Sequence, residues 1–208
     1  MATKNSRLHA PNAQSCPGVI IGSNPIRDAD LILKIITPHS GKKSILARGA
    51  RKSFKRFAAA FDLFDIGEFT FRPSRNLDGL LILEEFTPSN TNKRSCELRE
   101  SFEKICCASL ICEICDKLSL EEDHTEEQVF ELVTGFLTQL PQTETTRELL
   151  KKSYTASVYL LAQAGYIDPS TVPPAGVKSF TTILGEVERY SGRILRSKSS
   201  VLSLCRSI

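Results

Sequence analysis

The clearest chemical potential in this sequence lies in one short cationic stretch. Residues 42–56 (KKSILARGARKSFKR) hold seven lysines and arginines, and residues 31–61 hold eight of them without an acid. Clustered cations bind phosphate backbones because each phosphate that they neutralise releases counterions. A solvated charged face normally mixes both signs, so the pattern favours a nucleic-acid contact. The expected phosphate contacts in this stretch are Lys42, Lys43, Arg48, Arg51, Lys52, Lys55 and Arg56.

Two phenylalanines and a glycine lie among these cations. Phe54 and Phe57 could stack on unpaired bases, which is how proteins hold single strands without reading their sequence. At helical spacing, however, such residues more often form the core side of a short helix. Gly49 allows the backbone to bend sharply or to approach a ligand closely.

Three cysteines offer a second kind of chemistry. Cys107, Cys112 and Cys115 form C-x4-C-x2-C, the ligand spacing of plant-type iron–sulfur clusters. Here they fall in an apolar pattern that predicts a buried helix, without the glycines that let a chain wrap a cluster. Free cysteine packs as a small hydrophobe, so we expect buried thiols and neither a metal nor another cofactor. An iron–sulfur DNA-processing enzyme is the less favoured alternative.

No enzyme signature accompanies these residues. The segment 41–44 (GKKS) looks like the end of a phosphate-binding loop, but the G-x-x-x-x-G-K-[ST] pattern fails. Ile36 stands at its first glycine and Lys43 at its hydroxyl position. The three histidines are scattered and no nucleophile motif is present. The sequence therefore predicts a protein without a catalytic site.

The elements that carry the cations read as β-structure. Strands are expected at residues 19–21, 31–37, 44–47, 65–72 and 80–86, with turns at 22–25 and 38–41 and a short helix at 54–61. This element order is that of an OB-fold, a five-stranded Greek-key barrel that binds nucleic acid through its loops. Arg27 would lie in the loop between the first two strands, and Arg72 and Arg75 would flank the loop between the last two. These three arginines therefore join the expected DNA contacts.

The second half of the chain is predicted to be helical. Residues 98–118 are apolar on nearly every face, which is typical of a central, buried helix. Capping boxes at 125–128 and 145–148 should begin two more helices, which end at Pro141 and near Gly165. A proline-rich loop at 169–176 should precede a final helix at 180–190 with a basic tail.

Charge also divides the chain in two. Residues 1–95 hold 15 cations and 8 acids, whereas residues 96–208 hold 12 cations and 16 acids. A basic first half and an acidic second half indicate surfaces with different partners. We expect an α+β chain whose parts are a flexible extension (1–17), an OB-fold (18–88) and an all-helical domain (93–208).

Residues 18–49 (GVIIGSNPIRDADLILKIITPHSGKKSILARG) resemble the opening of RecO proteins. The shared pattern is a strand, an acidic turn, a second strand ending in Thr, a Gly-Lys turn and then Ala-Arg-Gly-Ala-Arg, here residues 47–51. The similarity continues through 61–86 and the helices, and it returns at 190–197 (YSGRILRS), which resembles the family's last helix. It covers most of the chain beyond the first 17 residues, and residues 26–56 are its most specific part.

The resemblance implies a non-enzymatic mediator of DNA repair and recombination in the RecF pathway. Such a protein binds single- and double-stranded DNA, promotes annealing, and helps load recombinase together with RecR and single-strand-binding protein. The acidic tail of the latter could contact Arg189, Arg193, Arg196 and Lys198. The family often has a four-cysteine zinc module after the Gly-Tyr that is here Gly165-Tyr166. Residues 167–204 contain no cysteine, so no zinc is expected.

One alternative keeps the basic run but changes its partner. A protein-only adaptor would use these cations to bind an acidic protein rather than DNA. In either case we expect a cytoplasmic, nucleoid-associated protein with mostly reduced cysteines and no membrane partner. No apolar run approaches the ~20 residues that cross a bilayer, and the first 16 residues do not form a secretory signal.

Overall fold

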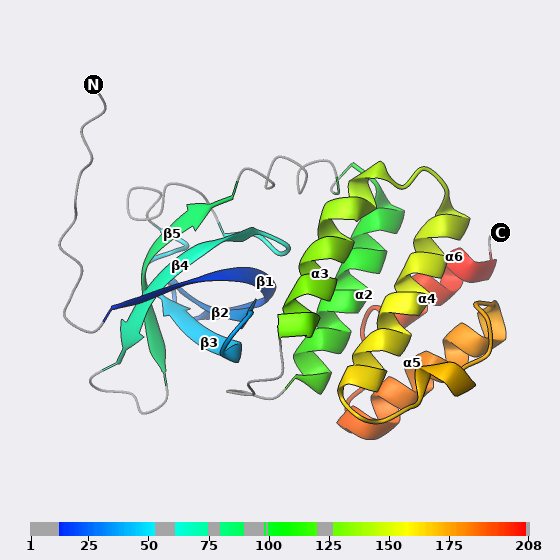
Figure 1. Cartoon of the computed structure of the whole chain (residues 1–208). Helices are drawn as coiled ribbons and strands as arrows, with labels where there is room; N and C mark the ends of the chain where they lie inside the picture. Colours follow the sequence, from blue (N-terminus) through cyan, green and yellow to red (C-terminus); the bar gives the residue numbers. More distant parts are fainter. Residues whose placement is uncertain are drawn as a thin grey trace.

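A computed structural model describes residues 13–52, 61–74, 80–89, 98, 100–119 and 127–206. A five-stranded barrel lies beside a bundle of helices (Figure 1). The strands are β1 (Gln14–Ile26), β2 (Asp30–Thr37), β3 (Gly41–Ala47), β4 (Ile66–Pro73) and β5 (Leu81–Pro88). The barrel closes in the order β1-β2-β3-β5-β4, with β3 and β5 parallel and the other pairs antiparallel. The predicted OB-fold followed by helices is confirmed.

Strand β1 closes the barrel because it pairs with two neighbours. Its residues 14–19 pair with β4, and its residues 19–26 pair with β2. Two predictions for this region were wrong. The strand begins at Gln14, inside the expected extension, and it continues through the turn expected at 22–25. Pairing of residues 22–26 with β2 outweighs the local preference of Gly22, Asn24 and Pro25 for a turn.

Alternating apolar residues fill the barrel. Fully buried side chains from all five strands form its interior, including Ile20, Leu33, Ile45, Phe69 and Leu83. This is the period-2 pattern of strands with one face in a closed core. The short helix expected at 54–61 falls almost entirely outside the described residues.

Among the described residues five α-helices follow, and α2 (Phe102–Leu118) is the central one. The others are α3 (Glu127–Gln139), α4 (Thr146–Gln163), α5 (Val177–Ser191) and α6 (Lys198–Arg206). Helix α2 is buried along most of its length and packs against each of the other four. The Oγ1 atom of Thr145 accepts a hydrogen bond from the Glu148 N–H at 3.3 Å, which confirms the predicted start of α4. The other expected capping box begins outside the described residues.

The end of the chain differs from the prediction. Helix α5 stops where Gly192 adopts a left-handed conformation with φ of 65°, and the expected basic tail forms α6 instead. Residues 190–197 therefore end α5 and connect it to α6 rather than forming a last helix. Glu113 of α2 fixes this connection, because its carboxylate accepts hydrogen bonds from the N–H groups of Arg196 and Ser197 at 2.9 and 3.0 Å.

A second hydrophobic cluster, separate from the core inside the barrel, joins the barrel to the bundle. Val19, Ile21, Ile36 and Phe64 of the barrel belong to the same buried cluster as the apolar residues of the helices. Figure 1 shows α2 and α3 as the helices nearest the barrel. The two parts are therefore packed as one body. Within the described residues, no helix combines the length and apolar character needed to span a bilayer.

Candidate nucleic-acid interface

Two turns at one end of the barrel bring four of the predicted cations together. The β1–β2 turn carries Arg27, and the turn that follows β3 carries Arg48, Arg51 and Lys52. The Arg51 N–H donates to the carbonyl of Ala29 at 3.0 Å, so the turns are joined through their backbones. All four cationic residues are exposed. We call this group of Arg27, Arg48, Arg51 and Lys52 the twin-turn surface.

Backbone geometry fixes the shape of the twin-turn surface. Gly49 has a φ of 70°, and its N–H donates to Oδ1 of Asp30 at 2.8 Å. The Lys52 N–H returns to the carbonyl of Gly49 at 3.2 Å. Arg27 also adopts a left-handed conformation, with a φ of 54°. Because hydrogen bonds fix the backbone of both turns, the positions from which the cationic side chains extend are fixed as well. Asp28 is the exposed acid in these turns, and with four cations beside it the net charge of the turns is positive.

Lys42 occupies a different place, between the barrel and the bundle. Its Nζ donates to the backbone carbonyl of Asp116 at 2.7 Å and lies 3.5 Å from that residue's Oδ1. Lys34 donates to both carboxylate oxygens of Asp116, at 2.9 and 2.7 Å. The Lys42 side chain is only 13% exposed. A desolvated cation needs such partners, so Lys42 has a structural role here and is not counted in the twin-turn surface.

Two further candidates lie on strands. The Arg72 Nε donates to Oε1 of Glu84 at 2.7 Å, so its charge is paired across β4 and β5. Lys43 is half-buried on β3 and lies near the Cys16 thiol. Burial and the Glu68 carboxylate raise the pKa of Cys16 to about 11, and Lys43 opposes them. The remaining candidates lie outside the described residues; they are Lys55, Arg56, Arg75, Phe54 and Phe57.

The cysteine motif lies along one continuous helix. Cys107, Cys112 and Cys115 are buried in α2, as expected for core thiols. At roughly 100° per residue, Cys107 and Cys112 leave the helix about 140° apart, so the motif cannot converge on one cluster. Burial raises the pKa of Cys107 to about 11, although metal ligands must be thiolates. Among the described residues, no group of three His, Cys, Asp or Glu side chains could hold a metal ion. The geometry gives no support to the iron–sulfur alternative.

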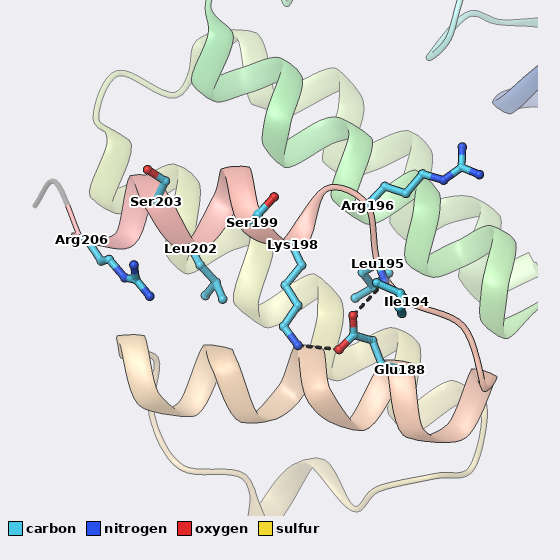
Figure 2. Close-up of a pocket in the computed structure, with 9 residues that line it drawn as sticks. All are labelled: Glu188, Ile194, Leu195, Arg196, Lys198, Ser199, Leu202, Ser203 and Arg206. Carbon is cyan, nitrogen blue, oxygen red and sulfur yellow. Dashed lines mark hydrogen bonds and ion pairs between the residues drawn. The ribbon is translucent and has the colours of Figure 1, made fainter.

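The four C-terminal cations have different surroundings. Arg189 pairs with Glu186, and Lys198 pairs with Glu188 at 2.5 Å, whereas Arg193 and Arg196 are exposed. Arg196 and Lys198 line a groove of about 550 Å³ between the end of α5 and helix α6 (Figure 2). The groove also contains Ile194, Leu195, Leu202, Arg206 and three further residues, which are Glu188, Ser199 and Ser203.

Sequence reasoning missed Arg206 and the apolar part of this groove. Lys198, Leu202 and Arg206 are spaced by four residues, so helical periodicity in the basic tail could have placed them on one face. Ile194 is 81% exposed, which is unusual for so apolar a side chain. Arg189 and Arg193 do not line the groove.

The chain matches two domain models of one family. Residues 13–88 match the model described as "Recombination protein O N terminal", and residues 99–167 match "Recombination protein O C terminal". Together the two matches cover more than half of the chain.

Curated relatives agree with these matches. DNA repair protein RecO of Desulfatibacillum aliphaticivorans is 34% identical over 152 residues, which cover 73% of this chain and 56% of the relative. The Syntrophus aciditrophicus protein of the same name is 31% identical over 139 residues, or 64% of this chain and 50% of the relative. That of Listeria monocytogenes is 30% identical over 127 residues, or 60% and 46%. The chain spans about half the length of these relatives. The barrel, the helices and both domain matches lead to one assignment: the chain belongs to the RecO family.

Proposed function

We propose that this protein is a non-enzymatic mediator of DNA repair and recombination that binds DNA through the twin-turn surface. The observation that carries the proposal is the joining of two cationic turns by the hydrogen bond from Arg51 to Ala29. Four exposed cations then share one end of a rigid barrel. The relatives are named DNA repair proteins, which supports DNA as the polyanion.

The surface suits phosphate backbones rather than base sequence. Arginine and lysine neutralise phosphates and release counterions, and this gives affinity without sequence readout. Binding to single and double strands and promotion of annealing follow from the same property. A cationic surface reduces the repulsion between two strands and gives their bases time to pair. Such a role needs no covalent step.

The direct test is DNA binding by the whole chain across a salt series. If the four cations each neutralise one phosphate of a single strand, the log–log salt slope is about −2.8. The triple variant Arg48→Ala, Arg51→Ala, Lys52→Ala should bind more weakly and flatten the slope by about 2. Arg147→Ala, an exposed arginine at the start of α4, is the matched control and should leave the slope unchanged. An unaltered slope in the triple variant would remove this surface from the proposal.

The C-terminal groove supports a second part of the proposal, the acidic tail of single-strand-binding protein as a partner. Arg196, Lys198 and Arg206 supply cations, and Ile194 and Leu202 supply an apolar surface. A short peptide with acidic and apolar residues fits this combination. Arg206→Ala should weaken binding of a labelled tail peptide without affecting DNA binding. The twin-turn triple variant should weaken DNA binding without affecting the peptide.

Work with RecR in loading recombinase belongs to the same proposal and is supported by family membership.

The protein-only adaptor gives the opposite result in competition. In that case an acidic protein would occupy the twin-turn surface, and DNA at moderate salt would not displace it. An oligonucleotide that displaces an acidic peptide bound at the twin-turn surface favours the DNA mediator. The same oligonucleotide should not displace a peptide bound in the C-terminal groove.

A further inference from the structure

An aromatic column lies on the surface of the helical bundle, away from the twin-turn surface. The rings of Tyr166 and Tyr190 stack with centroids 4.2 Å apart and planes 13° from parallel. The guanidinium of Arg189 lies 4.1 Å from the centroid of the Tyr190 ring. Tyr190 Oη also donates to the Tyr166 carbonyl at 3.3 Å. Three planar groups from two separate segments are therefore stacked in order.

The ends of two helices place this column at the surface. Gly165, with a φ of 75°, follows α4, and the Tyr166 N–H bonds back to the carbonyl of Leu161 at 3.0 Å. Gly192 ends α5 two residues after Tyr190. A Cβ added to Gly165 or to Gly192 would meet nothing within 4 Å, so neither glycine is packed against another segment on that side. Tyr166 is 39% exposed.

Arg189 covers one end of the column, and Tyr166 lies at the other. One face of Tyr190 is covered by Tyr166, so Arg189 must occupy its other face. Arg189 is held there by its ion pair with Glu186. Tyr166 has one ring face against Tyr190, and 39% of the residue is exposed, so part of its surface is open to solvent.

We infer that Arg189, Tyr190 and Tyr166 form a stacking platform for an unpaired nucleic-acid base, with exposed Arg193 beside it as a phosphate contact. Every base has a π-face, so aromatic platforms hold single strands without sequence preference. A base is favoured over a partner's guanidinium because exposed Arg193 follows Tyr190 by three residues and adds a positive charge near the column. The nearby acids Glu186 and Asp168 are engaged, with Arg189 and Ser170 respectively. This inference rests on the proposed function in DNA binding.

The platform would give the molecule a second contact with a single strand. Figure 1 shows α2 and α3 between the barrel and α5, so the twin-turn surface and the platform lie on different parts of the molecule. A strand held at both places would follow the surface of the whole protein. The barrel would supply charge, and the bundle would supply stacking.

Intrinsic fluorescence can report on the helical half of the protein, where the platform lies. The chain has no tryptophan, and its four tyrosines (Tyr154, Tyr159, Tyr166 and Tyr190) all lie in the helical half. Titration of the full chain with oligothymidylate should quench tyrosine emission to saturation. Tyr159→Phe, which removes an exposed tyrosine outside the column, should retain this quenching. Tyr166→Leu should reduce the quenching and weaken single-strand binding by about fivefold or more, whereas Tyr166→Phe should keep the affinity.

Crosslinking of the unaltered protein provides a test that does not depend on a variant's fold. An oligonucleotide with photoreactive halogenated uracils should crosslink to the peptide that contains Tyr166. If crosslinks map only to the barrel and Tyr166→Leu binds normally, the platform is refuted while the twin-turn proposal stands. Absence of DNA binding by the unaltered chain overturns both. Quenching by an arginine-rich peptide but not by the oligonucleotide would assign the platform to a protein partner and refute the inference.

Discussion

Cations at the two ends of strand β3 belong to one acid-free run in the sequence, yet they have different surroundings. At the start of the strand, Lys42 is half-buried and shares Asp116 with Lys34. Beyond the strand end, Arg51 and Lys52 are exposed in a turn fixed by backbone hydrogen bonds. The difference comes from a carboxylate 74 residues further along the chain. Local composition therefore identifies a cationic run, but long-range packing decides which of its members face solvent.

The largest effect should come from removing that carboxylate. Asp116→Ala leaves Lys34 and Lys42 half-buried without their shared anion, and it should reduce the free energy of unfolding by about 2 kcal/mol. DNA binding by the folded protein should not weaken. Chemical denaturation measures the loss, with Glu131→Ala, an exposed acid of α3, as the control. Equal losses in the two variants would contradict a specific role for Asp116.

A pair of single substitutions sharpens the comparison within the run itself. Lys42→Ala should lower the free energy of unfolding by about 1 kcal/mol, because it removes an ion pair and a hydrogen bond, and should leave the DNA salt slope unchanged. Arg51→Ala should change stability by less than about 0.5 kcal/mol, as surface substitutions usually do. It should flatten the salt slope on single strands by about 0.7. If both variants behave alike, the division between structural and exposed cations is wrong.

Helix α2 also carries Glu113, which binds the connection between α5 and α6 and extends the comparison to pH. Burial alone would raise the pKa of Glu113, but hydrogen bonds from Ser197 and Arg196 and the charge of Lys117 lower it overall. A carboxyl whose folded pKa is depressed stabilises the protein above its unfolded pKa, and this contribution is lost as pH falls through the folded value. Glu113→Gln should therefore cost about 1 kcal/mol near neutral pH and less in acid. Urea unfolding at pH 7 and below pH 4 measures this; a pH-independent loss would contradict it.

The fold was predictable from local patterns wherever those patterns agreed with long-range pairing. The β-branched run of β2, the alternating pattern of β4 and the apolar length of α2 each identified an element correctly. Strand β1 was underestimated because Gly22, Asn24 and Pro25 have turn preferences that only its pairing with β2 overrides. The role of Lys42 could not be predicted, because no local sequence pattern identifies Asp116 as its partner.

The candidate site was predictable in part for the same reason. Arg27 and Arg51 were correctly placed in or near loops, but only the structure shows that their turns are joined by a backbone hydrogen bond. The stacking of Tyr166 on Tyr190 joins segments 24 residues apart, and nothing in the sequence of either segment predicts that the two rings meet. Contacts between distant segments define both surfaces.

The buried cluster that crosses from the barrel into the bundle has a consequence for how the chain unfolds. Val19 and Ile21 lie on the strand that closes the barrel, and they also pack in the helical core. Separation of the two parts would expose these side chains, together with Ile36 and Phe64, to water. The barrel and the bundle should therefore melt in a single cooperative transition rather than in two steps. Either part expressed without the other should be prone to aggregation.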